Sequence, residues 1–267
     1  MNQLVFEEKG ALAEIGDLRK PYLDGLLEAQ ELYLELMIRK SRVFVIQSQD
    51  RQIGYFLLGD GAVLLEYYVT PDNLKQADTL FGMILEKFSI HKALCKSFDH
   101  MLLSCCAGFQ KEVNVIGIHF REYRDDGTLP IAEGVTCRLA KAGEAQKIIA
   151  VNEEVFEQDE EVHEYISKQQ IVLFEKEKEM VGFGIFARVI EGRPEFDIGM
   201  CVDRRFRRQG YGESIIRYLV EFCKQNGWRP VCGCAVENQA SRRCLEKAGF
   251  IGRYRLLEFV FLESISD

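Results

Sequence analysis

The residues in this chain that are best suited to chemistry lie at 207–212, where the sequence reads Arg-Arg-Gln-Gly-Tyr-Gly. A β-rich run at 196–202 precedes them, and an amphipathic run at 211–225 follows. A glycine loop between a strand and a helix can seat an anion, because the first helical N–H groups have no intrahelical partner and lie at the positive end of the helix dipole. The two glycines permit close approach of the backbone, and the two arginines add positive charge. The pattern predicts a phosphate-binding loop.

Two other kinds of phosphate loop fit the same residues less well. A Walker A loop needs a Lys and then Ser or Thr after its second glycine, whereas Glu213 and Ser214 follow here. A dinucleotide-binding fingerprint needs a third glycine three residues further on, at the position of Ile215. The stretch therefore predicts a phosphate seat of a different class.

A second motif lies one helix and one strand downstream. It reads Asn-Gln-Ala-Ser at 238–241 and then Lys-Ala-Gly-Phe at 247–250. In this order and at this spacing, the two motifs resemble the GNAT superfamily of acetyl-CoA-dependent N-acetyltransferases. The pyrophosphate loop of that family reads Arg/Gln-x-x-Gly-x-Gly/Ala, and its fourth helical segment runs from an Asn to a Gly-Phe. The resemblance covers roughly residues 134–263, about half of the chain.

The resemblance implies an enzyme that moves an acetyl group from acetyl-CoA to a primary amine of a small molecule or peptide. In the family, the pantetheine arm lies along the fourth strand like an added strand, and a main-chain N–H there serves the tetrahedral oxyanion. Asn238 would hydrogen-bond the arm from the other side, and Ser241 would either cap the next helix or contact the cofactor. The cofactor-binding residues so implied are Met200, Cys201, Val202, Arg207, Arg208, Gln209, Gly210, Tyr211, Gly212, Asn238 and Ser241.

The two proton transfers of such a reaction are where this chain departs from the family. Many relatives carry a Tyr seven residues after the Asn, and that position here is Leu245. Cys244, a tyrosine such as Tyr254, or water would then protonate the thiolate, or the thiolate would leave unprotonated because it is a weak base. For each candidate base the alternative is a solvated carboxylate, because strand facing depends on where the fourth strand bulges. The candidate bases are Asp197, Glu237, and Glu154 or Glu157.

The composition is that of an ordinary globular protein of 267 residues, 47% hydrophobic and 28% charged. This length predicts two compact domains. A net charge of −8 argues against a broad nucleic-acid-binding surface, which is usually basic. No apolar run approaches the roughly 18 residues of a membrane span, and the first twenty residues are unlike a signal peptide.

Nine scattered cysteines predict a reduced, cytoplasmic protein rather than a disulfide framework. Cys232 and Cys234 have the spacing of a metal-binding pair, but in a strand that spacing is also typical of small buried residues. We therefore expect no metal. The sequence leaves open whether the protein forms a homodimer and which amine it acetylates.

Hydrophobic periodicity and turn signals predict a similar order of elements in both halves. In the first half, helices are expected at 22–39, 73–91 and 101–109, and strands at 42–47, 53–58, 62–69, 94–98 and 113–123. In the second half, helices are expected at 142–156, 160–168 and 211–225, and strands at 135–139, 170–175, 180–189, 195–202, 231–236 and 251–262. The expected fold class is mixed α/β (α+β), with two GNAT-like domains, each a mixed, mostly antiparallel sheet flanked by helices.

A charged segment with Gly and Pro at 124–133 predicts the boundary between these domains, which are expected at 1–125 and 134–267. The first domain is expected to be a degenerate copy without a phosphate loop. Its counterpart of the loop, 69–75, contains neither Gly nor Arg. It would serve to pack against the working half and shape the substrate cleft.

Two other classes of protein remain open at this level. One is a non-catalytic module that binds or senses acetyl-CoA, favoured by Leu245 and by the missing loop in the first half. The other is a structural or interaction protein in which 210–212 is only a tight turn between a strand and a helix. That second alternative leaves the motif at 238–250 unexplained.

Overall fold

The computed structural model describes residues 4–125, 127, 132–153 and 155–261. Their contacts divide the chain into two compact units. Within the described part, unit 1 comprises residues 4–118, 235–237 and 254–261, and unit 2 comprises the remainder. The final strand thus groups with unit 1, whereas the sequence prediction assigned 134–267 to one domain. The predicted link at 124–133 lies partly outside the described residues.

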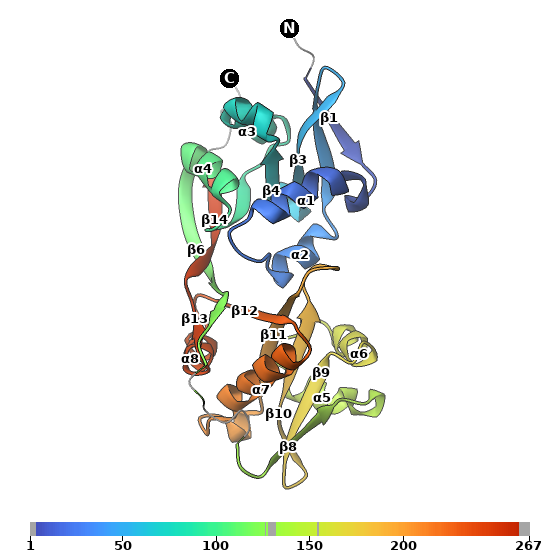
Figure 1. The fold of residues 1–267 in the computed structure, drawn as a ribbon, viewed down its shortest axis with the longest axis vertical. Helices are drawn as coiled ribbons and strands as arrows, with labels where there is room; N and C mark the ends of the chain where they lie inside the picture. Colours follow the sequence, from blue (N-terminus) through green and yellow to red (C-terminus); the bar gives the residue numbers. More distant parts are fainter. Residues whose placement is uncertain (1–3, 126, 128–131, 154, 262–267) are drawn as a thin grey trace. The chain divides into compact units, whose positions relative to one another are not determined.

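Unit 1 is built on a mostly antiparallel sheet with the strand order β1-β2-β3-β4-β5-β14-β6 (Figure 1). Its strands are β1 (Leu4–Lys9), β2 (Arg42–Ser48), β3 (Arg51–Gly59), β4 (Val63–Val69), β5 (Lys92–Lys96), β6 (Gln110–Phe120) and β14 (Tyr254–Phe261). Its helices are α1 (Gly16–Gly25), α2 (Leu32–Ile38), α3 (Ala77–Lys87) and α4 (His100–Phe109). The predicted meander β2-β3-β4 is confirmed, and β4 and β5 run parallel. The sequence prediction missed β1, which pairs with β2.

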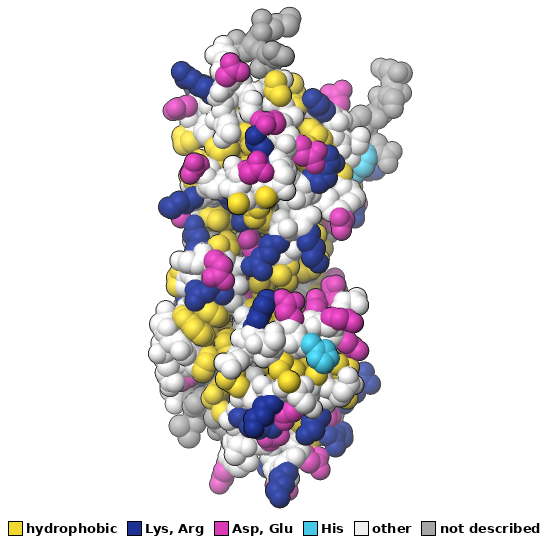
Figure 2. Space-filling view, turned by 90° about the vertical axis from the view of Figure 1, so that its right-hand side faces the viewer, with side chains coloured by type: hydrophobic (Ala, Val, Ile, Leu, Met, Phe, Trp, Pro, Cys, Tyr) yellow, Lys and Arg dark blue, Asp and Glu magenta, His cyan; other side chains and the backbone are white. Residues whose placement is uncertain are grey.

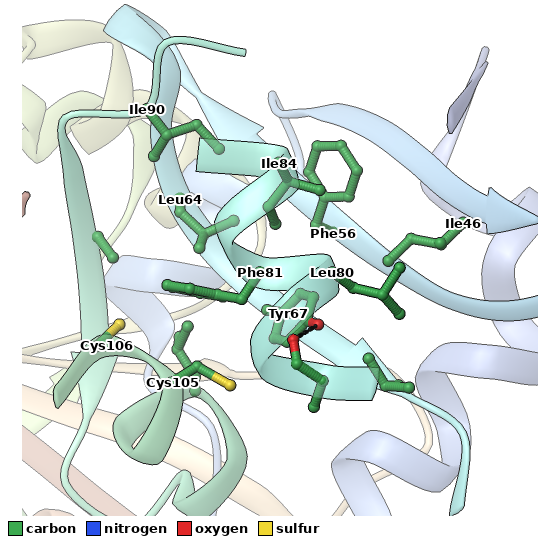
Figure 3. Close-up of a cluster of buried hydrophobic side chains, with 14 of the residues drawn as sticks. Ile46, Phe56, Leu64, Tyr67, Leu80, Phe81, Ile84, Ile90, Cys105 and Cys106 are labelled. Atoms are coloured by element: carbon green, nitrogen blue, oxygen red, sulfur yellow. Dashed lines mark hydrogen bonds between the residues drawn. The ribbon is translucent and has the colours of Figure 1, made fainter. Parts of the chain in front are cut away.

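Apolar clusters cover both faces of the unit 1 sheet. On one face, Phe81 and Ile84 from α3 pack with the strand residues Phe56 and Leu64 (Figure 3). On the other face, α1 and α2 contribute Leu18 and Leu34 to a separate cluster. Burial on both faces explains why these strands read as nearly continuous apolar runs rather than alternating ones.

The single helix predicted at 22–39 is wrong, because the structure has α1 and α2 there with an extended segment between them. Leu26 and Glu31 both have extended backbone angles, with ψ of 138° and 140°. The apolar spacing carries on through the break because both helices pack onto the same core. Periodicity alone therefore could not reveal the break.

Unit 2 contains a second sheet, with the strand order β12-β11-β10-β9-β8, and a small two-stranded sheet of β7 and β13. Its strands are β7 (Glu122–Tyr123), β8 (Val135–Leu139), β9 (Ile171–Lys176), β10 (Glu179–Arg188), β11 (Glu195–Val202), β12 (Arg229–Ala235) and β13 (Phe250–Ile251). Its helices are α5 (Ala145–Val151), α6 (Asp159–Ser167), α7 (Tyr211–Gln225) and α8 (Gln239–Lys247). β11 and β12 run parallel, and the pairs from β8 to β11 are antiparallel. The predicted mixed, mostly antiparallel fold is confirmed.

The helix predicted at 142–156 is shorter than expected. A 3₁₀ turn occupies Ala142–Glu144, and α5 ends at Val151. Asn152 then forms a local turn, because its side-chain oxygen accepts from the N–H groups of Val155 and Phe156, each at 3.1 Å. Such side-chain-to-backbone bonds compete with helix continuation.

The surface carries charges of both signs. On the face seen in Figure 2, Lys and Arg side chains are interspersed with Asp and Glu. The nine cysteines are free thiols. Within the described residues, no helix combines the length and apolarity needed to cross a bilayer.

Candidate functional site

The predicted phosphate loop lies between β11 and α7 in unit 2. Gly210 is the N-cap of α7, with φ +86° and ψ −4°. A Cβ placed on Gly210 would meet no atom within 4 Å. The left-handed backbone, rather than crowding, is therefore the reason for glycine here. The open space lies beside the unpartnered N–H groups and the positive dipole end of a 15-residue helix.

Gly212 is required for a different reason. A Cβ on Gly212 would stand 2.9 Å from Sγ of Cys244 and 3.5 Å from Cγ2 of Val202. The missing side chain thus lets α7 pack closely on α8 and β11. The sequence identified both glycines with ligand approach, and the structure adds a packing role for the second.

Arg207 of the loop and Arg204, from the 3₁₀ helix Arg204–Phe206 before it, share one carboxylate. Arg207 donates from Nη2 to Glu153 at 2.5 Å, and the Arg204 Nε also bonds the Glu153 carboxylate. Arg207 further donates from Nε to the main-chain oxygen of Val202 at 3.0 Å. These contacts fix the Arg207 guanidinium beside the end of β11. They also lower the pKa of Glu153, through hydrogen bonds from Arg207 first and Arg204 second.

The other two arginines of the segment 204–208 differ from each other. Arg205 pairs with Asp203 at 2.9 Å and with Glu179 at 3.2 Å. Arg208 has φ +62° and forms no ion pair within the described residues. Of the two positive charges that the sequence assigned to the phosphate, Arg207 therefore already has a carboxylate partner, shared with Arg204, and Arg208 forms no ion pair within the described residues.

β11 has an edge that is only partly used. It pairs with β12 over Glu195–Asp197 alone, whereas it pairs with β10 over Phe196–Val202. Residues 198–202 thus have no β12 partner in the described register. An extended, amide-rich arm can pair with an edge of this kind as an added strand.

Asn238 caps α8. Its side-chain oxygen accepts from the N–H of Ser241 at 2.9 Å. Asn238, and not Ser241, therefore caps α8. Contact with the cofactor is the role that stays predicted for Ser241. The bond sets the orientation of the Asn238 amide, a condition for any directed contact with a cofactor.

Cys244 is poorly suited to protonate a thiolate. Its thiol lies against Gly212, and burial raises its pKa to about 12. An ordinary thiol has a pKa of about 8.5, so proton transfer from Cys244 to a departing thiolate is uphill. Leu245 is 2% exposed and belongs to the core.

The candidate bases occupy different parts of the structure. Asp197 is partly exposed and is the last β11 residue paired with β12, opposite Val231. Glu157 is exposed, and its N–H donates to the carboxylate of Glu161. Glu237 lies in the segment 235–237 of unit 1. Glu154 lies outside the described residues.

Tyr254 and Tyr211 both have neighbours. The Tyr254 ring packs edge-on against Phe98 in unit 1, with centroids 5.3 Å apart. Tyr211 is buried at the start of α7, and its hydroxyl accepts from Lys176 Nζ at 3.2 Å. Tyr211 therefore anchors the helix end to β9.

Glu153 is the site residue that sequence reasoning missed. It lies in the loop between α5 and α6, more than fifty positions from the arginines that it contacts. No local spacing signals a contact of that separation.

Models of one family match both halves of the chain. An acetyltransferase (GNAT) domain matches residues 11–123, and the acetyltransferase (GNAT) family matches residues 143–250. The chain belongs to the GNAT superfamily. It is a GNAT-type acyltransferase with one GNAT domain in each half. A search of curated proteins found no match.

Several solved GNAT structures share the fold over nearly the whole chain. An acetyltransferase of the GNAT family from Colwellia psychrerythraea has a TM-score of 0.87 at 16% identity, covering 97% of this chain and 100% of that one. A tandem GNAT protein from the clavulanic acid biosynthesis pathway has a TM-score of 0.62 at 12% identity, covering 99% and 100%. A GCN5-related N-acetyltransferase from Sphaerobacter thermophilus has a TM-score of 0.57 at 13% identity, covering 98% and 96%. At these identities the likeness establishes the tandem GNAT fold alone.

The two GNAT domains share one backbone feature that aligns them. A Cβ on Gly54 would stand 2.2 Å from the Tyr68 carbonyl oxygen, and a Cβ on Gly182 would stand 2.4 Å from that of Cys201. Gly54 pairs with Val69 at the end of β4, as Gly182 pairs with Val202 at the end of β11. The 3₁₀ helix Pro71–Gln76 of the first domain therefore stands where the second has its arginine and glycine loop.

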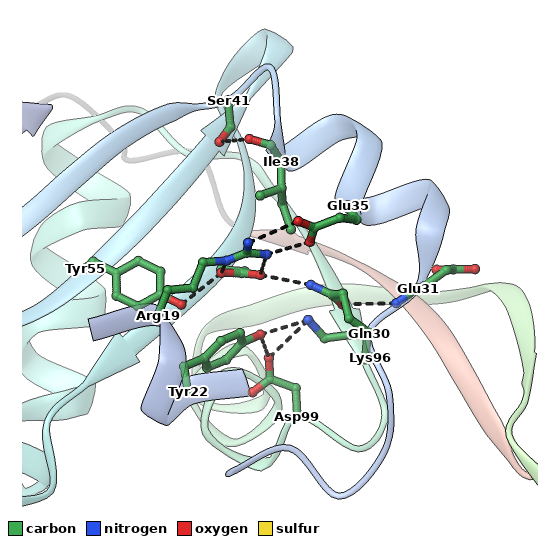
Figure 4. A network of polar contacts seen from close by, with 11 residues as sticks. Arg19, Tyr22, Gln30, Glu31, Glu35, Ile38, Ser41, Tyr55, Lys96 and Asp99 are labelled. Atoms are coloured by element: carbon green, nitrogen blue, oxygen red, sulfur yellow. Dashed lines mark hydrogen bonds and ion pairs between the residues drawn. The ribbon is translucent and has the colours of Figure 1, made fainter. Parts of the chain in front are cut away.

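The first GNAT domain fills the region beside this strand with its own side chains. The N–H of Val69 donates to Sδ of Met101, which comes from α4, at 3.3 Å. Asp99 caps α4 as Asn238 caps α8, but its carboxylate also accepts from the Tyr22 hydroxyl at 2.6 Å. Lys96 in turn donates to Tyr22 (Figure 4).

A second part of the same network surrounds Glu66 on β4, which is fully buried. Arg19 forms paired hydrogen bonds with Glu66 and with Glu35. Gln30 and Tyr55 each donate to Glu66 at 2.9 Å. Four donors thus bind the two oxygens of the buried Glu66 side chain, which satisfies its hydrogen bonding inside the protein.

Proposed function

We propose that this protein transfers an acetyl group from acetyl-CoA to a primary amine of a small molecule or peptide, and that the second GNAT domain alone binds the cofactor. The observation that carries the proposal is the left-handed Gly210 cap, which opens α7 beside an arginine loop at the end of β11. The first domain has a 3₁₀ helix without glycine at the equivalent place. A reducing, cytoplasmic setting remains our expectation.

Each part of the second domain has a task in this proposal. The N–H groups at the start of α7 and Arg208 bind the pyrophosphate, together with Arg207 once its carboxylate partner is displaced. The edge of β11 at Met200–Val202 pairs with the pantetheine arm and offers main-chain N–H groups to the oxyanion. Asn238 holds the arm from the side of α8.

Proton transfer plays a small part in this mechanism. The amine attacks the thioester carbonyl carbon, the C–S bond breaks with its electron pair on sulfur, and the thiolate leaves without help from Cys244, whose pKa is about 12. A thiolate is a weaker base than an alkoxide, so a positioned acid contributes least here. Asp197 is the candidate to accept the proton of the amine, because it lies on β11 where the pairing with β12 ends.

The test is amine-dependent release of free CoA. Purified protein is incubated with acetyl-CoA and a panel of primary amines, including a polyamine, an amino acid ester and short peptides, and thiol release is followed. We expect at least one amine to raise the rate above the blank hydrolysis rate. Tight acetyl-CoA binding with no amine-dependent release across the panel would favour the alternative of a non-catalytic acetyl-CoA-binding or sensory module.

A further inference from the structure

We propose that Glu153 is a positioning residue that occupies Arg204 and Arg207 in the free protein and is displaced by the pyrophosphate of the cofactor, so that cofactor binding loosens the hydrogen bonds of Asn152 to Val155 and Phe156. This inference rests on the proposed function of the same site. It assigns a role to a residue outside the two motifs of the loop and of α8. It also gives the order of events: the carboxylate leaves the arginines as the phosphate arrives.

The contact is a tertiary one with both carboxylate oxygens in use. Arg204 bonds Oε1 of Glu153 and Arg207 bonds Oε2. The Glu153 side chain is 28% exposed, against 42% for Arg207 and 80% for Arg204. Two guanidinium groups, one from the phosphate loop and one from the 3₁₀ helix before it, thus converge on one carboxylate at the protein surface. A single negative charge fills that point in the free protein.

The loop that carries Glu153 is anchored on each side of it. On one side, the main-chain oxygen of Val151 accepts from the thiol of Cys201 on β11 at 3.3 Å. On the other, Phe156 is buried, and its ring packs with those of Tyr165 and Phe183 at centroid distances of 5.1 and 6.0 Å. The chain is therefore held at Val151 and at Phe156, on either side of Glu153.

The exchange of anions is energetically reasonable. Ion pairs between exposed groups contribute about 0–1 kcal/mol each, so the Glu153 contacts are weak enough to be displaced. Phosphate oxygens carry more charge and match the guanidinium fork better than a shared carboxylate does. The neighbouring Arg205 is held by two other carboxylates, Asp203 and Glu179. Glu153 is thus the carboxylate whose departure frees Arg204 and Arg207.

The first arm of the test compares Glu153→Gln with Glu179→Gln. Both variants remove one negative charge from a carboxylate bound to an arginine of the loop region, but Glu179 pairs with Arg205 alone. We expect Glu153→Gln to bind CoA roughly 3- to 10-fold more tightly by calorimetry, and Glu179→Gln to change affinity less than about twofold. Equal shifts in the two variants would reduce the effect to general charge, and weaker binding by Glu153→Gln would show that the carboxylate prepares Arg207 for the cofactor. Either result overturns the proposal.

The second arm starts from the free protein, and its ligand-free comparison separates this inference from the proposed function. Hydrogen–deuterium exchange is followed at the amides of Val155 and Phe156, which the Asn152 turn holds. We expect roughly 3- to 10-fold faster exchange in free Glu153→Gln than in wild type or Glu179→Gln. At saturating CoA, wild type and Glu153→Gln should exchange alike. If wild type binds no CoA, the proposed function fails by itself, whereas unchanged exchange in free Glu153→Gln would overturn the role of Glu153.

Discussion

The two GNAT domains place the same backbone crowding, at Gly54 and Gly182, beside the ends of equivalent strands, and then diverge. After Val202 the chain turns through an arginine loop into a glycine-capped helix, whereas after Val69 it enters the 3₁₀ helix Pro71–Gln76. The sheet and its glycine contact are preserved in both. A GNAT domain can therefore keep its sheet without the phosphate loop, because the loop is a local feature and the core of the domain does not depend on it.

The domains also differ in what lies against the strand. In the first, Glu66, Asp99, Lys96 and Arg19 form a buried network that the helices α1 and α2 complete. In the second, the equivalent strand presents Gly199 and Cys201 and ends beside open space at Gly210. Burying charged groups is costly unless they are paired and hydrogen-bonded. The first domain therefore has an interlocked polar interior beside this strand, whereas the second domain is the one that we propose binds the cofactor.

The largest expected effect follows from breaking the network of the first domain. Arg19→Met should destabilise the protein by about 3–5 kcal/mol, because it leaves the buried carboxylates of Glu35 and Glu66 without their cation. Urea unfolding gives the free energy, and Arg42→Met is the matched control. Arg42 pairs with Glu8 at 58% side-chain exposure, against 8% for Arg19, so its removal should cost less than about 1 kcal/mol. Similar losses in the two variants would contradict a structural role for the network.

The next effect separates the two domains by their left-handed glycines. Gly210→Val should weaken CoA binding by roughly 10- to 100-fold, because the side chain resists positive φ at about 1–3 kcal/mol and stands where the phosphate approaches. Gly61→Val is the control, since Gly61 has φ +65° and equally open surroundings in the first domain. It should carry a similar folding cost without changing affinity. Equal affinity of both variants for CoA in calorimetry would remove the phosphate role of Gly210.

The smallest effect is expected from the thiol. Cys244→Ser should leave turnover within about twofold, and the pH–rate profile should show one rising limb that reports deprotonation of the amine. Because the pKa of Cys244 is about 12, the thiol stays protonated throughout the usual assay range and adds no step of its own. A descending alkaline limb that disappears in Cys244→Ser would show that the thiol donates a proton. Leu245→Tyr is a poorer probe, because it overpacks a residue that is 2% exposed.

Much of the second domain could be predicted from the sequence because its signals are local. The amphipathic pattern at 211–225 and the strands at 135–139 and 195–202 coincide with α7, β8 and β11. Gly210 could be predicted because the residues on either side of it indicate a loop before a helix, where a glycine with positive φ is favoured. The cofactor roles of the loop, of Asn238 and of Met200–Val202 stay predictions that binding experiments must test.

The features that sequence reasoning missed depend on distant contacts. In the break between α1 and α2, Gln30 donates a hydrogen bond to Glu66 on β4, 36 positions away. The last strand, β14, pairs with β5 in unit 1, although it follows unit 2 in the chain. Glu153 meets its arginines across the fold of unit 2. Composition and periodicity report on neighbours along the chain, so none of these three contacts leaves a local signature.

The central claim is that the tandem protein has one cofactor site rather than two. Titration of the whole chain with acetyl-CoA in a calorimeter measures the number of sites directly. We predict a stoichiometry near one, with affinity weakened roughly 10- to 100-fold in Gly210→Val and unchanged in Gly61→Val. Two sites of similar affinity in the wild-type protein, or one site of unchanged affinity in Gly210→Val, would contradict the assignment of cofactor binding to the second domain alone.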